Sequence, residues 1–305
     1  MKVIERILLD ENLNIDNNTF IFDIETTGLS PKFCKVILIG ILYNCQDKTI
    51  IKQFFAENED EEKDILTAFV NDIKSFCKHV TYNGLGFDIG FINYRLKKHN
   101  IDYNLDKEDD FDIFRFIKQF KTSLGLEDFS LNTVETYFDI HRDDIIDGSE
   151  SVKLYKKFVE NKDQEIMDTI LLHNYEDIYN LSKLINIKDM IKEKLELVEL
   201  NGRNYNLKVF PLNYKINAKK LVMNYFIFTG EHNNISIYND DYSIICQDNN
   251  ISLEININKG IDREKNTILF YNLSKIIPLK FNNDVLEANI YSLCNFIMKN
   301  ELCNI

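Results

Sequence analysis

The chain has 305 residues, of which 45% are hydrophobic and 28% are charged, an ordinary composition for a globular protein. The length favours two domains over one core. The net charge of −13 argues against a protein that grips long stretches of duplex nucleic acid, because such proteins usually carry a basic surface. The charge is uneven, since residues 201–305 carry 11 basic and 10 acidic side chains and the acidic excess lies in residues 1–200.

The cysteines and the apolar stretches bear on the location of the protein. The six cysteines form no C-x-x-C pair and no cluster with histidine, so we expect neither a disulfide framework nor a zinc site. The longest apolar stretch, 36–43, is too short to span a bilayer, and acids interrupt the first residues before a signal peptide can form. We therefore expect reduced thiols, no membrane partner and a cytoplasmic location.

The first two thirds of the chain predict a mixed α/β domain. Residues 3–15 read as a short helix or an irregular entry, and a hairpin-length connector joins the second and third strand candidates. A later strand–helix–strand crossover predicts a mixed sheet with helical cover. The expected strands are 19–25, 35–44, 49–55 and 80–83, and the expected helices are 65–77, one from about 87, 113–121, 130–138, 150–161, 163–184 and 186–200.

The last third changes to a β-rich pattern with Asn, Asp and Gly in the turns. Its expected strands are 221–228, 235–238, 242–246, 251–257 and 267–271, and a last helix covers about 284–299. We expect a small antiparallel sheet closed by that helix. The predicted organisation is therefore a domain of residues 1–187, a bridging helix of residues 188–200 and a small β-rich (α+β) domain of residues 201–305.

Residues 19–29, with the sequence TFIFDIETTGL, are the stretch around which the first domain is organised. The nearly continuous apolar run fits a central strand covered on both faces. Asp23 and Glu25 interrupt it, and they share one face because side chains alternate along a strand. Two buried carboxylates repel each other unless a cation lies between them, and oxygen ligands suit Mg²⁺ or Mn²⁺. The alternative is an edge strand whose acids face water.

Two further segments place acids where a site could form. Asp88 ends the sequence NGLGFD at the start of a helix, where its alternative role is to satisfy the helix N-terminus. His173 and Asp177 lie four residues apart on a helix and so share a face, although such pairs are often only surface contacts. Together with Asp23 and Glu25, these segments supply four carboxylates that could hold two cations about 4 Å apart.

Three motifs resemble the exonuclease motifs of the DnaQ-like (DEDD) superfamily of 3′–5′ exonucleases: FDIETTGL at 22–29, YNGLGFD at 82–88 and HNYED at 173–177. The resemblance covers about residues 16–185, and the first motif is the most specific. The middle region, including Arg142 and Asp147-Gly148, resembles the bacterial YprB-type branch. The resemblance implies a ribonuclease H-like fold with a mixed five-stranded sheet flanked by helices.

The resemblance also implies the chemistry and the roles of individual residues. It implies a hydrolase that uses two Mg²⁺ or Mn²⁺ ions to release nucleoside 5′-monophosphates from single-stranded DNA or RNA 3′ ends. The metal carboxylates map onto Asp23, Glu25, Asp88 and Asp177, the general base onto His173, and the substrate-binding positions onto Thr26, Thr27, Gly28, Leu29 and Asn83. One spacing departs from the histidine subclass, because His173 lies four rather than five positions before Asp177.

Two other functions remain open at this level. One is a catalytically weak module that binds nucleic-acid ends, for which the altered histidine spacing is the support. The other is a phosphodiesterase of short oligonucleotides, which the acidic net charge favours. A protein partner that binds through residues 201–305 is a further possibility, and the choice between DNA and RNA stays open because no residue announces a contact with a 2′-hydroxyl.

Overall fold

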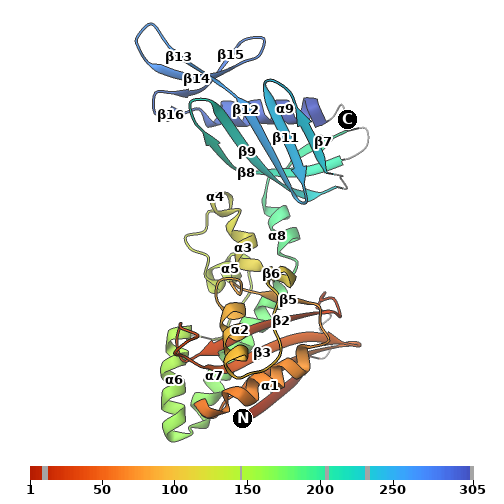
Figure 1. The fold of residues 1–305 in the computed structure, drawn as a ribbon, viewed down its shortest axis with the longest axis vertical. Helices are drawn as coiled ribbons and strands as arrows, with labels where there is room; N and C mark the ends of the chain where they lie inside the picture. The colour runs from red at the N-terminus through yellow and green to blue at the C-terminus, as the bar shows by residue number, and fades with distance from the viewer. Residues whose placement is uncertain (9–12, 145, 203–205, 231–233, 303–305) are drawn as a thin grey trace. The chain divides into compact units, whose positions relative to one another are not determined.

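The computed structural model describes residues 1–8, 13–144, 146–202, 206–230 and 234–302. The chain divides into two compact units, Met1–Ile187 and Lys188–Ile305 (Figure 1). Each unit buries its own set of apolar side chains. The two units are therefore described separately.

The first unit alternates strands with helices. Its strands are β1 (Lys2–Leu8), β2 (Thr19–Thr26), β3 (Val36–Cys45), β4 (Lys48–Phe55), β5 (Lys78–Thr81) and β6 (Asp110–Asp112). Its helices are η1 (Glu59–Glu61), α1 (Glu62–Ile73), α2 (Asp88–Lys98), η2 (Lys107–Asp109), α3 (Ile113–Lys118), α4 (Lys121–Leu124), α5 (Leu131–Tyr137), α6 (Gly148–Asn161) and α7 (Gln164–Lys183). Helix α8 (Ile187–Lys194) begins at the last residue of this unit.

The strands of the first unit form one mixed sheet in the order β1-β4-β3-β2-β5-β6. Strands β5 and β6 run parallel to β2, and the other neighbours pair antiparallel, so the predicted mixed α/β fold is confirmed. Within the described residues the sheet has six strands rather than the predicted five, and the expected helix or irregular entry at 3–15 was wrong. Lys2–Leu8 pairs along the edge of β4 instead, because that edge offers unpaired peptide groups. Residues 9–12 of that stretch lie outside the described residues.

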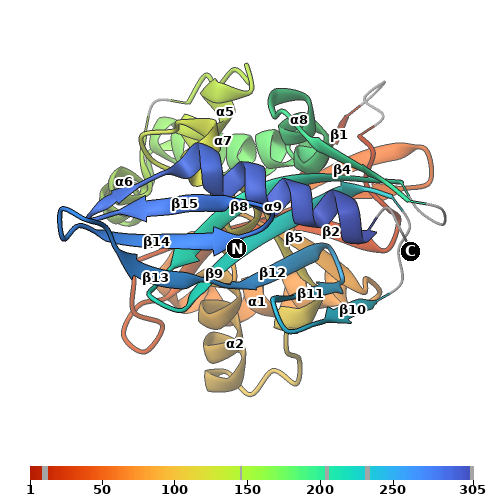
Figure 2. The same cartoon turned by 90° about the horizontal axis from the view of Figure 1, so that it is seen from above.

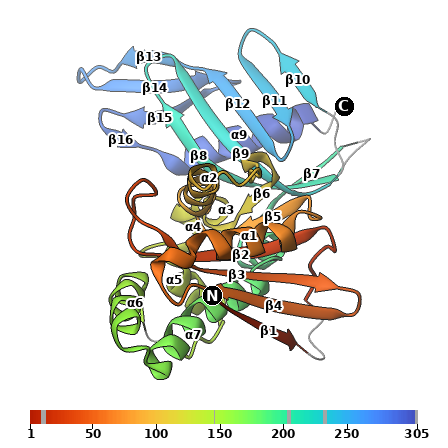
Figure 3. The same ribbon diagram turned by 60° about the horizontal axis from the view of Figure 1, so that its bottom comes forward.

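Helices cover both faces of this sheet. Phe20, Phe22 and Ile24 pack with the apolar faces of α1 and α2, whereas Ile37 and Phe55 pack with α6 and α7. Figure 3 shows α6 and α7 on one side of β1–β4 and α1 and α2 on the other. The strand β2 therefore lies inside the unit, and every second side chain of β2 points toward the layer that contains α7.

The described part of the second unit is β-rich and includes the long helix α9 (Figure 2). One sheet has the order β10-β11-β12-β9-β8-β7 and the other the order β13-β14-β15-β16, with antiparallel pairs throughout. The elements are β7 (Val198–Asn201), β8 (Asn206–Ile216), β9 (Lys220–Thr229), β10 (Ile235–Tyr238), β11 (Tyr242–Gln247), β12 (Asn250–Asn256), β13 (Asn258–Ile261), β14 (Thr267–Asn272), β15 (Ile276–Phe281), β16 (Asp284–Val285) and α9 (Glu287–Leu302).

Two details of this region differ from the sequence prediction. The bridging helix expected over 188–200 ends at Lys194, and Val198–Asn201 pairs with β8 because its side chains alternate like those of a strand. The expected small sheet is two sheets, and the core between strands and helix includes Cys294 and Met298 of α9. Among the described helices, none combines the length and the apolar character needed to cross a bilayer.

Candidate active site

Strand β2 supplies the first two functional side chains. Phe22 and Ile24 face the core under α1 and α2, so Asp23 and Glu25 face the opposite layer. Glu25 is buried, and Asp23 is half-buried. The alternative of an edge strand with acids in water is wrong, because β2 lies between β3 and β5 in the sheet.

Helices α7 and α2 supply the other predicted residues. On α7, which Asp163 caps at its N-terminus, His173 and Asp177 lie one turn apart on the face toward β2 and β3. Asp88 is the first residue of α2 and is buried to 5% exposure, so its carboxylate is not simply a solvated helix-capping group. Helix α2 packs on the opposite face of the sheet from α7, but the charge of Asp88 at its first residue acts on Asp23 of β2. The three sequence motifs therefore meet at β2.

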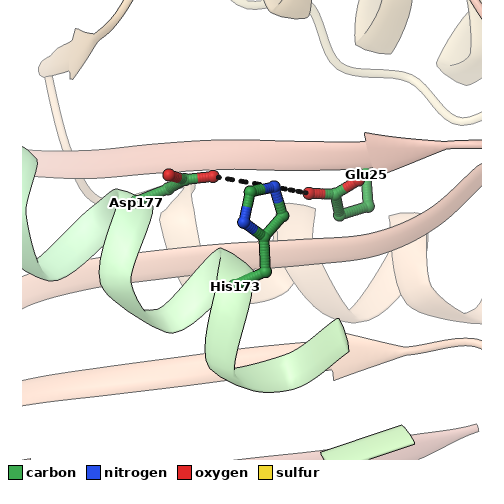
Figure 4. Close-up of side chains that lie close together, drawn as sticks. All are labelled: Glu25, His173 and Asp177. Atoms are coloured by element: carbon green, nitrogen blue, oxygen red, sulfur yellow. Dashed lines mark ion pairs between the residues drawn. The ribbon is translucent and has the colours of Figure 1, made fainter. Parts of the chain in front are cut away.

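Three of these side chains point toward one another. His173 Nε2 lies 3.4 Å from Glu25 Oε1 and 3.6 Å from Asp177 Oδ2 (Figure 4). Each of the three residues offers one ligand atom, and these atoms lie within 4.8 Å of one another. Figure 4 shows the imidazole between the two carboxylates, with Glu25 coming from β2 and the other two from α7.

The electrostatics of the site reflect carboxylates gathered in a buried place. Burial, followed by the charges of Asp177, Asp88 and Glu25, raises the pKa of Asp23 well above its ordinary value. Burial raises the pKa of Glu25 to about 7, against the opposing charge of His173. Burial also raises the pKa of Asp88 to about 7. These groups repel one another at neutral pH, so their oxygen-rich donor set fits divalent cations such as Mg²⁺ or Mn²⁺.

A cleft of about 1010 Å³ opens beside these residues. Asp23, Glu25, His173 and Asp177 line it, and Lys153 and Lys156 of α6 are among the other lining residues. Of the predicted substrate-binding residues, Thr26, Gly28 and Leu29 also line the cleft, and Leu29 is 85% exposed. Gly28 has a φ of +154°, and a Cβ at this position would lie 2.9 Å from Cys34 Sγ, so a larger residue would be strained there.

Thr27 and Asn83 take other positions. The Thr27 hydroxyl accepts the peptide N–H of Lys35 at 2.9 Å and so closes the loop that carries Gly28 and Leu29. Asn83 has a φ of +63° and packs its side chain against Gly86, while its peptide N–H donates to Asp112. Neither residue is among those that line the cleft as described. Both support the loops of the site.

A family model described as the RNase_H superfamily matches residues 20–188, which is more than half of the chain. The chain belongs to the RNase H superfamily. This assignment confirms the predicted ribonuclease H-like fold and, at the level of a nuclease superfamily, the predicted class of protein. The matched residues contain all three motifs of the site.

Two individual relatives match parts of the chain. A DNA polymerase III PolC-type protein of Ureaplasma parvum is 35% identical over 115 residues, which is 29% of this chain and 8% of that protein. The uncharacterized protein YprB of Bacillus subtilis is 27% identical over 172 residues, which is 55% of this chain and 41% of that protein. This chain therefore spans less than half the length of both relatives, and the resemblance to the YprB-type branch is confirmed.

Solved structures resemble the chain only in part. The family B DNA polymerase from the archaeon Pyrobaculum calidifontis is 18% identical, with a TM-score of 0.44, over 55% of this chain and 24% of that one.

Sequence reasoning missed two interactions that shape this RNase H-superfamily site, and the first involves Asn174. Its side-chain N–H₂ donates to Asp23 Oδ2 at 3.0 Å, and its Oδ1 accepts from Gln53 at 2.9 Å. Asn174 is fully buried under the sheet. The position of Asn174 directly after the motif histidine was the only hint of a role in the sequence. Its hydrogen-bond partner, Asp23, lies 151 residues away in the chain, so the contact could not be predicted.

The second missed interaction involves Arg142 and Asp144. His173 Nδ1 lies 2.5 Å from Asp144 Oδ2, and Arg142 Nη2 lies 2.7 Å from Asp177 Oδ1. The family resemblance includes Arg142 in its middle region but implies no role for this residue. Although burial acts in the opposite direction, the charges of Asp177 and Glu25 and the hydrogen bond with Asp144 raise the pKa of His173.

Gly40 of β3 allows α7 to approach the sheet. A Cβ at this position would collide with the amide of Asn174, which hydrogen bonds hold in place. We expect Gly40→Ala to lower the free energy of unfolding by about 2–4 kcal/mol, because it overpacks the core and breaks a buried network. Urea unfolding measures this loss.

Gly90 of α2 is the matched control for this substitution. A Cβ there meets nothing within 4 Å, and alanine is the better helix former. Gly90→Ala should therefore raise the free energy of unfolding by up to about 1 kcal/mol. Equal losses in both variants would show that the space beside Asn174 is not the cause.

Proposed function

We propose that the chain is a two-metal-dependent 3′–5′ exonuclease that releases nucleoside 5′-monophosphates from single-stranded DNA or RNA. The observation that carries this proposal is the convergence of the three motifs on one buried site. Asp23 and Glu25 of β2 interact electrostatically with Asp177 of α7, and Asp23 also with Asp88 of α2. Membership of the RNase H superfamily supports the same class of reaction.

The carboxylates of Asp23, Glu25, Asp88 and Asp177 would hold two Mg²⁺ or Mn²⁺ ions. When bound, such ions supply an activated water and stabilise the leaving 3′ oxygen. The raised pKa values of Asp23, Glu25 and Asp88 support this role, because buried carboxylates that repel one another gain most from a cation.

His173 is the proposed general base. Its Nδ1 atom is engaged by Asp144, so Nε2 is the atom that faces Glu25 and Asp177 and that would accept a proton from water. An imidazole suits this task near neutral pH. The spacing of four residues to Asp177 places the ring on the same helical face as that carboxylate, which supports the role despite the departure from the histidine subclass.

The cleft supports the binding of a chain end. Thr26, Gly28 and Leu29 line it beside the carboxylates, and the exposed Leu29 side chain is available to pack on a base. Lys153 and Lys156 on α6 add positive charge to a wall of the cleft, where phosphates would need it. Thr27 and Asn83 would act through the loops that they hold rather than by direct contact.

The acidic net charge of −13 favours one alternative, a phosphodiesterase of short oligonucleotides, because long polyanions are repelled. The experiment is to incubate 5′-labelled single-stranded DNA and RNA of about twenty nucleotides, and a dinucleotide, with Mn²⁺ or Mg²⁺. We expect a metal-dependent ladder that shortens from the 3′ end. Turnover of the dinucleotide alone would favour the alternative, and no cleavage would favour a binding module.

A further inference from the structure

The segment between α5 and α6 contacts both functional side chains of α7. We propose that Asp144 and Arg142 are positioning residues of this site: Asp144 fixes the imidazole of His173, and Arg142 fixes the carboxylate of Asp177. The inference rests on the proposed function and names residues that the sequence motifs did not assign to the reaction. In His173 and in Asp177, one polar atom of the side chain is bound by this segment and the other polar atom faces the candidate site.

The contact of Asp144 determines which nitrogen of His173 is available. Asp144 Oδ2 lies 2.5 Å from His173 Nδ1, and its carboxylate is 2% exposed. A neutral imidazole carries one N–H, and a carboxylate on Nδ1 keeps the proton there. The lone pair then lies on Nε2, the atom 3.4 Å from Glu25 and 3.6 Å from Asp177.

Arg142 likewise binds one oxygen of the Asp177 carboxylate and leaves the other facing the site. Its Nη2 donates to Asp177 Oδ1 at 2.7 Å, so Oδ2 is the oxygen that faces His173. Arginine stays charged and presents several N–H groups in one plane, which a lysine cannot reproduce. The two contacts therefore direct one atom of each side chain toward the same small region near Glu25.

Residues 142–144 of this segment are themselves fixed on two sides. The fully buried carboxylate of Glu135 on α5 accepts two bonds from Arg142, at 2.7 and 2.8 Å. Glu176 of α7 accepts the peptide N–H groups of Asp143 and Asp144, at 3.0 and 2.6 Å. A support held at this many points can keep a catalytic group in place without reorganisation during the reaction.

Asp144→Asn tests the first contact. Asp144 Oδ1 accepts the peptide N–H of Ile146 at 3.0 Å, so an asparagine that keeps this bond turns its N–H₂ toward His173 Nδ1. The proton of the ring then moves to Nε2. Following the usual effect of such supporting partners, we expect kcat on labelled DNA to fall about 10–100-fold with KM changed less than about twofold.

The ¹⁵N NMR signals of the His173 ring report which nitrogen carries the proton, and this measurement does not depend on nuclease activity. In ¹⁵N-histidine-labelled, EDTA-treated protein at pH 9, we expect the His173 ring to carry its proton on Nδ1 in the wild type and on Nε2 in Asp144→Asn. His173→Gln identifies the signal among the five histidines. The matched control is Asp72→Asn on α1, which breaks an ion pair with Lys52 of β4 and should change neither the ring signal nor kcat.

Arg142→Lys tests the second contact and keeps the charge. We expect kcat to fall about tenfold while the His173 signal stays on Nδ1, because Asp144 is still present. Thermal melting shows that each variant is folded at the assay temperature. A wild-type protein without nuclease activity but with the expected ring signals would contradict the proposed function. The proposal that Asp144 positions the His173 ring would still hold. An active Asp144→Asn protein with an unchanged ring signal or unchanged kcat would overturn the positioning proposal.

Discussion

Asp23→Asn should abolish metal-dependent cleavage and at the same time stabilise the metal-free protein. The cleavage rate should fall by at least about a hundredfold, because the substitution removes one of the charges that would bind and orient the cations. The free energy of unfolding in EDTA should rise by about 1–2 kcal/mol, because a neutral amide no longer repels Asp177, Asp88 and Glu25 in a buried place.

The local contacts permit this exchange of function for stability. Asn174 donates to Asp23 Oδ2 at 3.0 Å, and an asparagine can present its own oxygen to the same donor. Nuclease assays and urea unfolding in EDTA measure the two effects on the same preparation. A variant that kept its activity would contradict the site, and one that lost stability would contradict the repulsion among these carboxylates.

The metal-free protein should lose stability as the pH rises, and added metal should reverse this trend. Burial gives Glu25 and Asp88 pKa values of about 7 in the folded chain, above the values of about 4 expected when the chain is unfolded. The folded state therefore binds more protons between pH 4 and 7, and stability falls as the pH rises through that window. Thermal midpoints in EDTA at pH 5.5 and 8 measure this loss.

Divalent metal competes with those protons, so its stabilising effect should grow with pH. At a Mn²⁺ concentration about a hundred times the Kd, the gain is about 2.7 kcal/mol, and it should shrink at pH 5.5. His79 acts against the trend in EDTA, because burial lowers its pKa to about 4 and its folded form binds fewer protons. Comparison with Glu25→Gln isolates the site, and an equal metal effect in that variant would contradict the ligand assignment.

The elements with a clear period or motif could be predicted from the sequence. The sequence of residues 19–29 shows a buried strand and its paired acids together, and the long helix from Gln164 shows both its apolar face and the pair His173–Asp177. The first strand could not be predicted, because Lys2–Leu8 is exposed and mixed in polarity and is a strand through pairing with the edge of β4. In the last third of the chain, strands β8 and β15 were not predicted. Each contains a proline, which has no N–H to donate to a strand pair and so argues against a strand in the sequence.

The sequence by itself determined the fold class of residues 20–188 and supplied the candidate side chains of the proposed site, because a buried acid pair and a helical i, i+4 pair are local patterns. Only the tertiary structure decided how those side chains are held. Asn174, on a helix 151 residues further along the chain, donates a hydrogen bond to Asp23. Asp144 contacts Nδ1 of His173, and Arg142 contacts Oδ1 of Asp177. Such contacts depend on how the helices pack on the sheet, and no periodicity within a single segment records them.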